Sequence, residues 1–508
     1  MDYPIWSSGL SGGVLMAWVA ITHVIVAHFA IGGGLVVVAT EALSVKRADR
    51  ELRELARRSS LVLILVSTVF GAISGVGIWV VAGLISPGAI SSLIHTYVWG
   101  WAIEWVFFIV EIVAALVYYT TWDKISKGAH LMVGWLYVVS AYLSLVIING
   151  IITFMLTPGD WLASRAFWDG FFNPTYWPSL VLRTGIAALM AVAFMVFVAL
   201  KSSPERRPDI MRYLGWWWLA GALVSYAGYR WWEAALPDTV TAMFRGAEPW
   251  LPSLDATRAF TLWALAVGLA VGVLVLLAVP RLARAVTGVV LMVAAFAFFG
   301  GYERLREGVR KPFLIHSHLF SNGLLVSQIE AINAAGLAAH SGWVAQGDPS
   351  PEALGERLYL AQCSSCHSLD GYQSIRRALP SLADMELVAA DDPPGSGALH
   401  YRQECAACHR DVSYEEMAAM LPSVEEIRDD SEMIHELNRG MITMVILELR
   451  EMGADFAAFD PAETFDLRGL HRPVMPPFVG TDEEAEALAA YLVTLDRPNS
   501  GAAAVGGE

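Results

Sequence analysis

The four cysteines of this chain lie in two copies of one short motif, in which two cysteines flank two residues and a histidine follows directly. The copies are Cys363-Ser-Ser-Cys366-His367 and Cys405-Ala-Ala-Cys408-His409. The two-residue gap allows both thiols of a motif to bond to the vinyl groups of one haem, with the histidine beneath the iron as an axial ligand. The motifs therefore predict two covalently bound haems c.

Cysteine pairs at this spacing also occur in zinc ribbons and in redox-active dithiols. Neither of these sites requires a histidine directly after the second cysteine in both copies, so we interpret the motifs as haem attachment sites. Attachment of haem c is completed outside the cytoplasm. We therefore expect this part of the chain to lie on the periplasmic side of a membrane.

The composition divides the chain into an apolar part and an acidic part. The 508 residues are 56% hydrophobic and 16% charged, which is too apolar for a wholly soluble protein. The net charge of −15 arises in residues 345–508, which carry 30 acidic residues against 11 arginines and no lysine. Such a surface would attract a basic periplasmic electron-transfer protein and repel nucleic acid, although acidity can also serve only to keep a domain soluble.

Eight apolar segments are each long enough to span about 30 Å of hydrocarbon, so we expect a transmembrane bundle in the lipid bilayer. They lie near residues 10–42, 59–86, 96–120, 129–156, 178–200, 212–234, 257–279 and 285–302. The first segment has no basic leader and continues beyond the length of a signal-peptide core, so we expect it to be retained as a helix.

Lysine and arginine residues gather in alternate loops, after the first, third, fifth and seventh segments, as in residues 46–58 and 201–212. The intervening loops are poor in these residues and rich in aromatic residues, proline and aspartate. The positive-inside rule then predicts a multi-pass protein of the cytoplasmic membrane, with the N-terminus and the haem domain on the periplasmic side.

Ionisable residues within the predicted spans are costly to bury in a bilayer and are therefore candidates for function. Glu104 and Glu111 lie seven residues apart, about two helical turns, so they share one helix face and could carry protons or ligate a haem iron. His23 lies in the outer half of the first span. A single histidine in a helix is more often a hydrogen-bonded structural residue than a ligand, and both interpretations of His23 stay open at this point.

The first 200 residues resemble subunit I of the cytochrome bd quinol oxidases in a series of short matches that follow the same order. The matched positions are His23, Gly32, Glu41, the Gly-Ala-Ile-Ser-Gly segment at 71–75, residues 102–104 and 122–124, His130 and residues 149–150. Residues 307–312 are similar to a Glu-x-x-Arg-x-Pro segment after the eighth helix of that family. The resemblance therefore extends over the eight predicted spans.

In that family the histidine matched by His23 ligates a high-spin haem near the outer surface, and the acids matched by Glu104 and Glu111 lie beside the haem pair. The two acids are one residue further apart in the family. Its late haem-binding glutamate falls near Gly300, so Glu303, one turn further on, is the nearest substitute as an iron ligand. The resemblance implies one or more non-covalent haems of b or d type and a second membrane subunit.

The chain departs from the family where quinol would react. The family's low-spin haem has a histidine ligand in helix five and a methionine ligand in helix seven, and Arg183 and Phe260 occupy these positions here. The long quinol-binding loop is replaced by a short connection at 235–256, and the haem domain stands in place of the ninth helix. These departures imply that electrons pass through the c-type haems rather than through quinol. A cofactor-free bundle that only anchors the cytochrome domain is the alternative.

The end of the chain resembles class I cytochromes c. Short helical patterns at 352–360 and 398–404 precede the two motifs, and Met475 precedes a helix predicted at 485–495. Thr481 is followed three residues later by a glutamate, a capping pattern that supports the start of that helix. The resemblance implies that Met475 is a distal haem ligand and that the last helix packs on the first.

Met475 would serve the haem on Cys405 and Cys408, or the haem on the first motif if the second motif is an insertion. The other distal ligand is open among Met385, His400, Met417, Met420, His435, Met441 and His471. His316 and His318 lie after the last span, where a haem could pass electrons between domains, although surface histidines are usually only solvated.

The predicted fold is all-α, an eight-helix transmembrane bundle followed by a class I-like cytochrome c domain with two haems. We assign residues 1–302 to the bundle, 303–345 to a periplasmic linker, 346–496 to the dihaem domain and 497–508 to a disordered tail. The expected function is a membrane-bound haem electron-transfer subunit of a respiratory complex, in which iron in the membrane domain could reduce oxygen. The alternatives are a non-catalytic electron-transfer subunit and a quinone-reactive membrane cytochrome, each linking a periplasmic oxidoreductase to the membrane.

Overall fold

The computed structural model describes residues 3–6, 12–241, 254–370, 374–378, 431–455 and 475–495. The described residues form two compact units. One comprises residues 13–328 with 475–476, and the other comprises residues 3–6, 12 and the described residues within 329–455 and 477–495. The division at residue 329 lies inside the predicted linker, so the first part of that linker belongs to the apolar unit.

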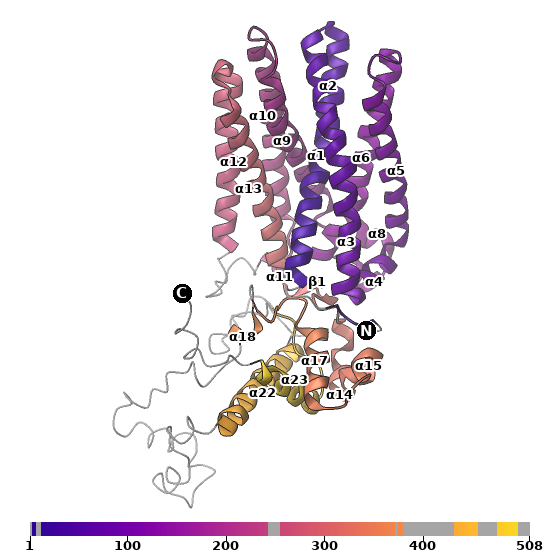
Figure 1. Ribbon diagram of the computed structural model, residues 1–508, viewed down its shortest axis with the longest axis vertical. Coiled ribbons are helices and arrows are strands. Elements are labelled where there is room, and N and C mark those ends of the chain that lie inside the picture. Colours follow the sequence, from indigo (N-terminus) through magenta and orange to yellow (C-terminus); the bar gives the residue numbers. More distant parts are fainter. Residues whose placement is uncertain are drawn as a thin grey trace, which may run out of the picture. The chain divides into compact units, whose positions relative to one another are not determined.

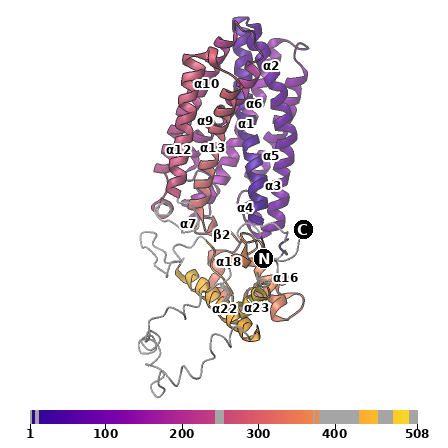
Figure 2. The same ribbon diagram turned by 60° about the vertical axis from the view of Figure 1, so that its left-hand side comes forward.

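The first unit is a set of long helices that run alongside one another (Figures 1 and 2). Their bounds are α1 Gly12–Arg47, α2 Arg50–Ile64, α3 Ala72–Ile85, α5 Val98–Thr120, α6 Lys127–Leu156, α9 Tyr176–Ala199, α10 Arg207–Ala234, α12 Leu254–Val271 and α13 Ala285–Arg310. A π-helical segment, Leu65–Gly71, joins α2 to α3, and a second, Gly272–Ala278, extends α12. Short helices lie at the ends of the long ones: α4 Pro87–Thr96, α7 Trp161–Ser164, α8 Phe167–Phe171 and α11 Asp238–Thr241.

Seven helices in the described part of the chain are long and apolar enough to cross a membrane, so the protein is a multi-pass membrane protein. They coincide with seven of the eight predicted spans. The remaining span, predicted at 212–234, lies within α10, a helix of 28 residues. Several tryptophans and the charged residues near both ends of α10 lower its mean hydropathy. A total of eight spans therefore stays a prediction.

Local signals explain where the helices begin at the loops that are rich in basic residues. The carboxylate of Asp49 accepts hydrogen bonds from the N–H groups of Glu51 and Leu52, at 3.0 and 3.1 Å, and so caps α2. The hydroxyl of Ser126 accepts one from the N–H of Ala129, at 3.2 Å, and caps α6. These caps satisfy backbone donors that have no partner within their helix.

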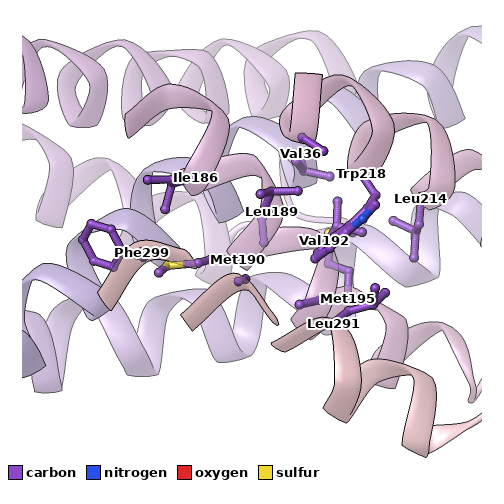
Figure 3. Close-up of a cluster of buried hydrophobic side chains, with 14 of the residues drawn as sticks. Val36, Ile186, Leu189, Met190, Val192, Met195, Leu214, Trp218, Leu291 and Phe299 are labelled. Carbon is purple, nitrogen blue, oxygen red and sulfur yellow. The ribbon is translucent and has the colours of Figure 1, made fainter. Parts of the chain in front are cut away.

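Helix α9 forms the centre of the first unit, because 18 of its 24 residues are buried. Figure 3 shows Leu189 and Val192 of α9 among side chains from α1, α10 and α13, including Val36, Trp218 and Phe299. The neighbours of α9 therefore hold one continuous apolar core.

Helices α9 and α10 approach each other closely at glycines. A Cβ atom on Gly185 would lie 2.5 Å from the Oγ of Ser225, and one on Gly228 would lie 2.4 Å from the backbone nitrogen of Leu182. Lipid tails are as apolar as leucine, so membrane helices gain contact mainly through such small residues and close packing.

A two-stranded antiparallel hairpin follows α13, formed by β1 Phe313–Ile315 and β2 Leu319–Phe320. The all-α prediction omitted it. The turn between the strands contains Ser317 with a φ of 57°, a left-handed conformation that is uncommon outside glycine.

The second unit consists of shorter helices: α14 Ile329–Ala335, α15 Leu337–His340, α16 Gly342–Ala345, α17 Pro351–Gln362, α18 Ile375–Ala378, α22 Ser431–Asp455 and α23 Asp482–Thr494. Helices α17 and α23 correspond to those predicted at 352–360 and 485–495, and they pack on each other. The helical pattern predicted at 398–404 and the tail predicted at 497–508 lie outside the described residues.

Candidate functional site

The first cysteine motif directly follows α17. The N–H groups of Cys366 and His367 both donate to the carbonyl of Cys363, at 3.1 and 2.9 Å, so the motif forms a compact turn. No disulfide joins Cys363 to Cys366. Burial raises the pKa of the Cys363 thiol to about 12, so this sulfur is protonated at neutral pH. The local geometry keeps both thiols available for thioether bonds.

The crossing of α17 and α23 supports this turn. A Cβ atom on Gly355 of α17 would lie 2.0 Å from the carbonyl oxygen of Ala487 in α23. One turn further along α17, the hydroxyl of Tyr359 donates to the carbonyl of His367, at 2.9 Å, and its ring lies 5.7 Å from that of Tyr491. The packing of the last helix on the first, which the resemblance to class I cytochromes c implied, is present.

Gln362, the last residue of α17, binds the segment that precedes α23. Its side-chain nitrogen donates to the carbonyl of Val479 and its side-chain oxygen accepts from the N–H of Val479, both at 2.9 Å. Val479 lies four residues after Met475 in the sequence, and Gln362 directly precedes Cys363. The side chain of Met475 is 36% exposed.

The predicted cap of α23 is present and has a second role. The hydroxyl of Thr481 accepts from the N–H of Glu484, and the carboxylate of Glu484 accepts from the N–H of Thr481, each at 3.3 Å. The same carboxylate also accepts from the N–H groups of Leu337 and Ala338 at the start of α15, at 2.7 and 2.8 Å. One buried acid therefore caps two helices.

The second motif, with Cys405, Cys408 and His409, lies outside the described residues. Five of the possible distal ligands lie outside them too: Met385, His400, Met417, Met420 and His471. The two that the structure describes lie on α22, where His435 is exposed and Met441 is partly buried. The second distal ligand stays open.

In the membrane unit, His23 of α1 lies against α3. Its Nδ1 is 3.2 Å from the hydroxyl oxygen of Ser74, which donates its own hydrogen to the carbonyl of Phe70 at 2.5 Å. Ser74 must therefore accept the hydrogen bond from Nδ1–H of His23. That tautomer leaves a lone pair on Nε2, the nitrogen that an iron would take. These residues fit an axial haem ligand.

Polar residues form three levels along the contact between α5 and α6. The α5 residues are Glu104, Glu111 and Tyr118, and the α6 residues at the same levels are Ser144, Tyr137 and His130. At the first level the hydroxyl of Ser144 donates to the carboxylate of Glu104, at 2.8 Å. At the second, Glu111 lies near enough to Tyr137 for an electrostatic interaction. At the third, the rings of Tyr118 and His130 are 4.4 Å apart. The seven-residue spacing thus places both predicted acids on the helix contact.

Glu41 of α1 joins the third level. Its carboxylate lies 2.8 Å from Nδ1 of His130 and accepts a hydrogen bond from the hydroxyl of Tyr118 at 2.7 Å. Nε2 of His130 is 2.8 Å from the carbonyl of Tyr118, so this nitrogen carries a hydrogen. The contact between Nδ1 of His130 and the carboxylate of Glu41 then holds one further proton, either on Nδ1 or on Glu41. Sequence reasoning noted both residues only as matched positions.

Arg183 occupies the position matched to the family's helix-five histidine, and it is 1% exposed. It donates to one carboxylate oxygen of Glu303 at 2.6 Å, and Arg306 donates to the other at 2.9 Å. Each carboxylate oxygen of Glu303 is thus engaged by one arginine. The role of Glu303 as an iron ligand stays a prediction.

His28 ends this ionic network on α1. Its Nε2 is 3.3 Å from a guanidinium nitrogen of Arg183, and its Nδ1 is 2.8 Å from the carbonyl of Val24. A guanidinium only donates and a carbonyl only accepts, so His28 is neutral with its hydrogen on Nδ1. The lone pair on Nε2 of His28 therefore already accepts from Arg183.

The network continues along α13, where Arg306 donates to Glu307 at 2.6 Å and Arg310 also pairs with Glu307. Sequence reasoning missed the network. Opposite charges three or four residues apart at the end of an apolar span, together with a single arginine inside another span, are the signals that could have indicated it.

Comparison with known proteins concerns the membrane unit. Residues 13–212 match the family model described as cytochrome bd terminal oxidase subunit I. Among solved structures, the bd oxidase from Geobacillus thermodenitrificans matches with a TM-score of 0.51 and 14% sequence identity, over 59% of this chain and 87% of that chain. No curated protein sequence matches the chain significantly. The chain therefore contains a multi-pass membrane domain that has the fold of bd oxidases and, over residues 13–212, matches their subunit I in sequence.

Proposed function

We propose that this chain is a haem-binding subunit of a respiratory complex, which passes electrons between periplasmic c-type haems and a non-covalent haem of b or d type that reduces oxygen. The observation that carries the proposal is His23. It lies on a span that matches subunit I of bd oxidases, with its Nδ1 bonded to Ser74 and its Nε2 left for iron. A bound haem would supply electron storage and, with one axial position open, a site for a small molecule.

The acids of α5 supply a route for protons. Glu104 is bonded to Ser144, and Glu111 lies one level further along the same helix face. The third level adds Glu41 and His130, which hold a proton between two titratable groups. A reaction that consumes protons inside a membrane needs such a sequence of exchangeable groups. These residues extend from the end of α5 that leads into a basic loop, through its middle at Glu111, to Glu104 in its first third.

Arg183 and Phe260 support electron entry through c-type haem. A guanidinium cannot serve as a normal axial ligand, and Arg183 is already engaged by Glu303 and His28. Phe260 is 56% exposed and has no ligating atom. The two positions at which the family holds its low-spin haem therefore lack ligands here, and the first cysteine motif offers the alternative electron carrier.

The remaining parts of the proposal concern topology and partners. The alternation of basic loops supports a cytoplasmic-membrane protein with its N-terminus and haem domain in the periplasm. The acidic charge of residues 345–508 favours a basic periplasmic electron-transfer protein as partner. Exposed apolar side chains along α3, among them Ile73, Val76 and Val80, suit lipid or a second membrane subunit.

A carbon monoxide difference spectrum of the reduced, purified protein tests this function, with haem types counted by alkaline pyridine extraction. We expect covalent haem c and also a non-covalent haem that binds carbon monoxide. Replacing His23 by Ala should remove that haem, whereas replacing the exposed His95 by Ala should keep it.

Three results would change the conclusion. If haem c is the only haem found, the membrane unit holds no cofactor and serves only to anchor the cytochrome domain. A non-covalent haem that does not bind carbon monoxide would favour a non-catalytic electron-transfer subunit. Reduction by quinol, rather than oxygen uptake from reduced cytochrome c, would favour a quinone-reactive cytochrome.

A further inference from the structure

A cavity at one end of the membrane unit has no part in the proposed electron or proton transfer. It has a volume of about 330 Å³ and lies between the start of α2 and the end of α9. This volume is at the lower end of the range of roughly 300–1,000 Å³ that is usual for small-ligand sites. Residues with four different chemistries line it: the cations Arg50, Arg58 and Lys201, the acids Glu51 and Glu54, the hydroxyls of Ser202 and Ser203, and the apolar Leu55 and Val198.

The two cations that face this cavity differ from the basic residues beside them. Arg50 and Lys201 have no acidic partner within the described ranges of the chain. On the same helix as Arg50, Arg53 and Arg57 pair with Asp123, at 2.7 and 3.0 Å. Two cations without an ion-pair partner in the described ranges therefore line the cavity.

The other charged residues of the lining leave it positive. Arg58 pairs with Glu54 at 2.6 Å, so that pair adds no net charge. Glu51 is the remaining acid, and it offsets one of the two unpaired cations. The lining as a whole has three cations and two acids, so its net charge is positive and it attracts an anion.

Its place in the fold limits which anion would bind. The cavity lies where two membrane spans end, beside loops rich in basic residues, which is the level of phospholipid head groups. Leu55 and Val198 give it an apolar wall, which an inorganic ion would not need. Basic pockets between helices at this level bind lipid phosphates in membrane proteins.

We infer that this cavity binds the phosphodiester head group of a membrane phospholipid, with Arg50 and Lys201 on the phosphate, the two serine hydroxyls as further donors, and Leu55 and Val198 beside the glycerol carbons. The inference does not depend on haem or on the proposed function, because every residue that carries it belongs to α2, α9 and the loop after α9.

The test uses the full-length protein in detergent and compares the double variant Arg50→Ala/Lys201→Ala with the control Lys124→Ala/Lys127→Ala. The control removes the same charge from another basic loop and leaves the cavity unchanged. Thermal unfolding is followed as phosphatidylglycerol in mixed micelles, or inorganic phosphate alone, is added. A ligand that binds only the folded state raises the unfolding temperature.

We expect phosphatidylglycerol to raise the unfolding temperature of the wild type and of the control, and to have little effect on the double variant. The phospholipid that copurifies should fall by about one molecule per chain in the double variant only. The same rise in all three proteins, or its loss in the control as well, would overturn the inference. If phosphate alone reproduces the rise, the site binds a free ion and not a lipid. The variant Arg50→Gln/Lys201→Gln repeats the test if the alanine variant does not fold.

Discussion

At the scale of single residues, the direction of each hydrogen bond decides which membrane histidine can bind iron. His23 gives its Nδ1 hydrogen to Ser74 and keeps a lone pair on Nε2. His28 uses its Nε2 lone pair on Arg183, and both nitrogens of His130 are engaged, by Glu41 and by a carbonyl. Of these three histidines, His23 alone has a nitrogen lone pair without a hydrogen-bond partner in the described structure. Ligation by His23 is therefore the simplest arrangement.

Replacing Ser74 by Ala removes the side-chain acceptor of His23 and leaves the backbone of Gly71 as its other partner. Outer partners of a ligating histidine typically contribute 10- to 100-fold to the affinity for the metal group, so we expect the membrane haem to be held about 10- to 100-fold less tightly. Transfer of haem to an excess of apomyoglobin measures this affinity. Thr22→Ala is the control, because the Thr22 hydroxyl bonds only to its own helix. Equal retention in both variants would contradict the assignment.

Replacing Arg183 by Ala leaves the partly buried carboxylate of Glu303 short of one partner. Breaking a fully buried ion pair from one side costs about 3–5 kcal/mol, and the unfolding free energy in detergent should fall by at most that amount. Arg230→Ala is the comparison: it removes from Glu233 an arginine whose side chain is 50% exposed, and Glu233 keeps Arg258 as a partner, so the loss should be about 0–1 kcal/mol. A similar small loss in both variants would show that Arg183 does not stabilise the bundle.

At the scale of elements, glycines and caps set the distances between helices. α17 and α23 cross at Gly355, where the carbonyl of Ala487 occupies the place of a side chain. The crossing and the two hydrogen bonds of Gln362 fix the residues on either side of the first motif. The second unit thus relies on contacts between α17, which leads into the first motif, and α23.

Gly355→Ala should open that crossing. Overpacking of this kind costs about 1–3 kcal/mol, and thermal unfolding of the haem unit reports the loss. Gly440→Ala in α22 is the matched control, since nothing lies within 4 Å of its added Cβ atom. Alanine is the better helix former, so the control should gain about 0.5–1 kcal/mol. Equal stability of the two variants would show that the crossing is looser than described.

The hairpin after α13 should open in acid. Burial lowers the pKa of His316 and of His318 to about 4, and for His318 the charge of Arg165 adds to the effect. The unfolded histidines titrate near 6.5, so between pH 6.5 and 4 the unfolded hairpin binds more protons than the folded one. Its stability is therefore complete above pH 6.5 and falls as the pH approaches 4.

Hydrogen exchange at two amides measures this opening: that of Ser321, which donates to the carbonyl of Pro312 across the hairpin, and that of Val326, which donates to the carbonyl of His318. After correction for the intrinsic rate, exchange should accelerate between pH 6.5 and 4. The variant His316→Gln/His318→Gln should show no such acceleration. Acceleration that persists in the variant would assign the opening to other groups.

At the scale of the whole molecule, the chain combines an apolar unit with the fold of bd oxidases and an acidic unit that contains the first cysteine motif. Two bonds from Gln362 tie Val479 to the helix before Cys363, and Met475 lies four residues before Val479 in the sequence. This connection favours the alternative in which Met475 serves the first haem and the second motif is an insertion.

That pairing can be tested in a background without the second haem, Cys405→Ala/Cys408→Ala. If Met475 serves the first haem, Met475→Ala in this background should lower the reduction potential of the remaining haem c and abolish its methionine–iron absorption band. Met444→Ala, an exposed methionine of α22, is the control. If Met475→Ala leaves the absorption spectrum of the remaining haem c unchanged, Met475 is the ligand of the second haem instead.

Much of this protein could be predicted from the sequence because the deciding interactions are local. The spacing of the cysteines, the length of the apolar segments and the cap from Thr481 to Glu484 each involve residues within one segment of chain. Such features survive any arrangement of the helices. The hairpin after α13 was missed because its strands of three and two residues are too short for a periodic pattern.

Only the tertiary structure decided which polar residues meet. Arg183 and Glu303 are 120 positions apart, and Arg183 and His28 are 155 apart. Their contact depends on how each helix is rotated and on how closely glycines let the helices approach, neither of which hydropathy records. The sequence by itself therefore determined seven spans that the structure contains, and the place of the first cysteine motif directly after a helix. The packing of the helices decided that His23 keeps a free nitrogen, and that Glu303 is bound by two arginines.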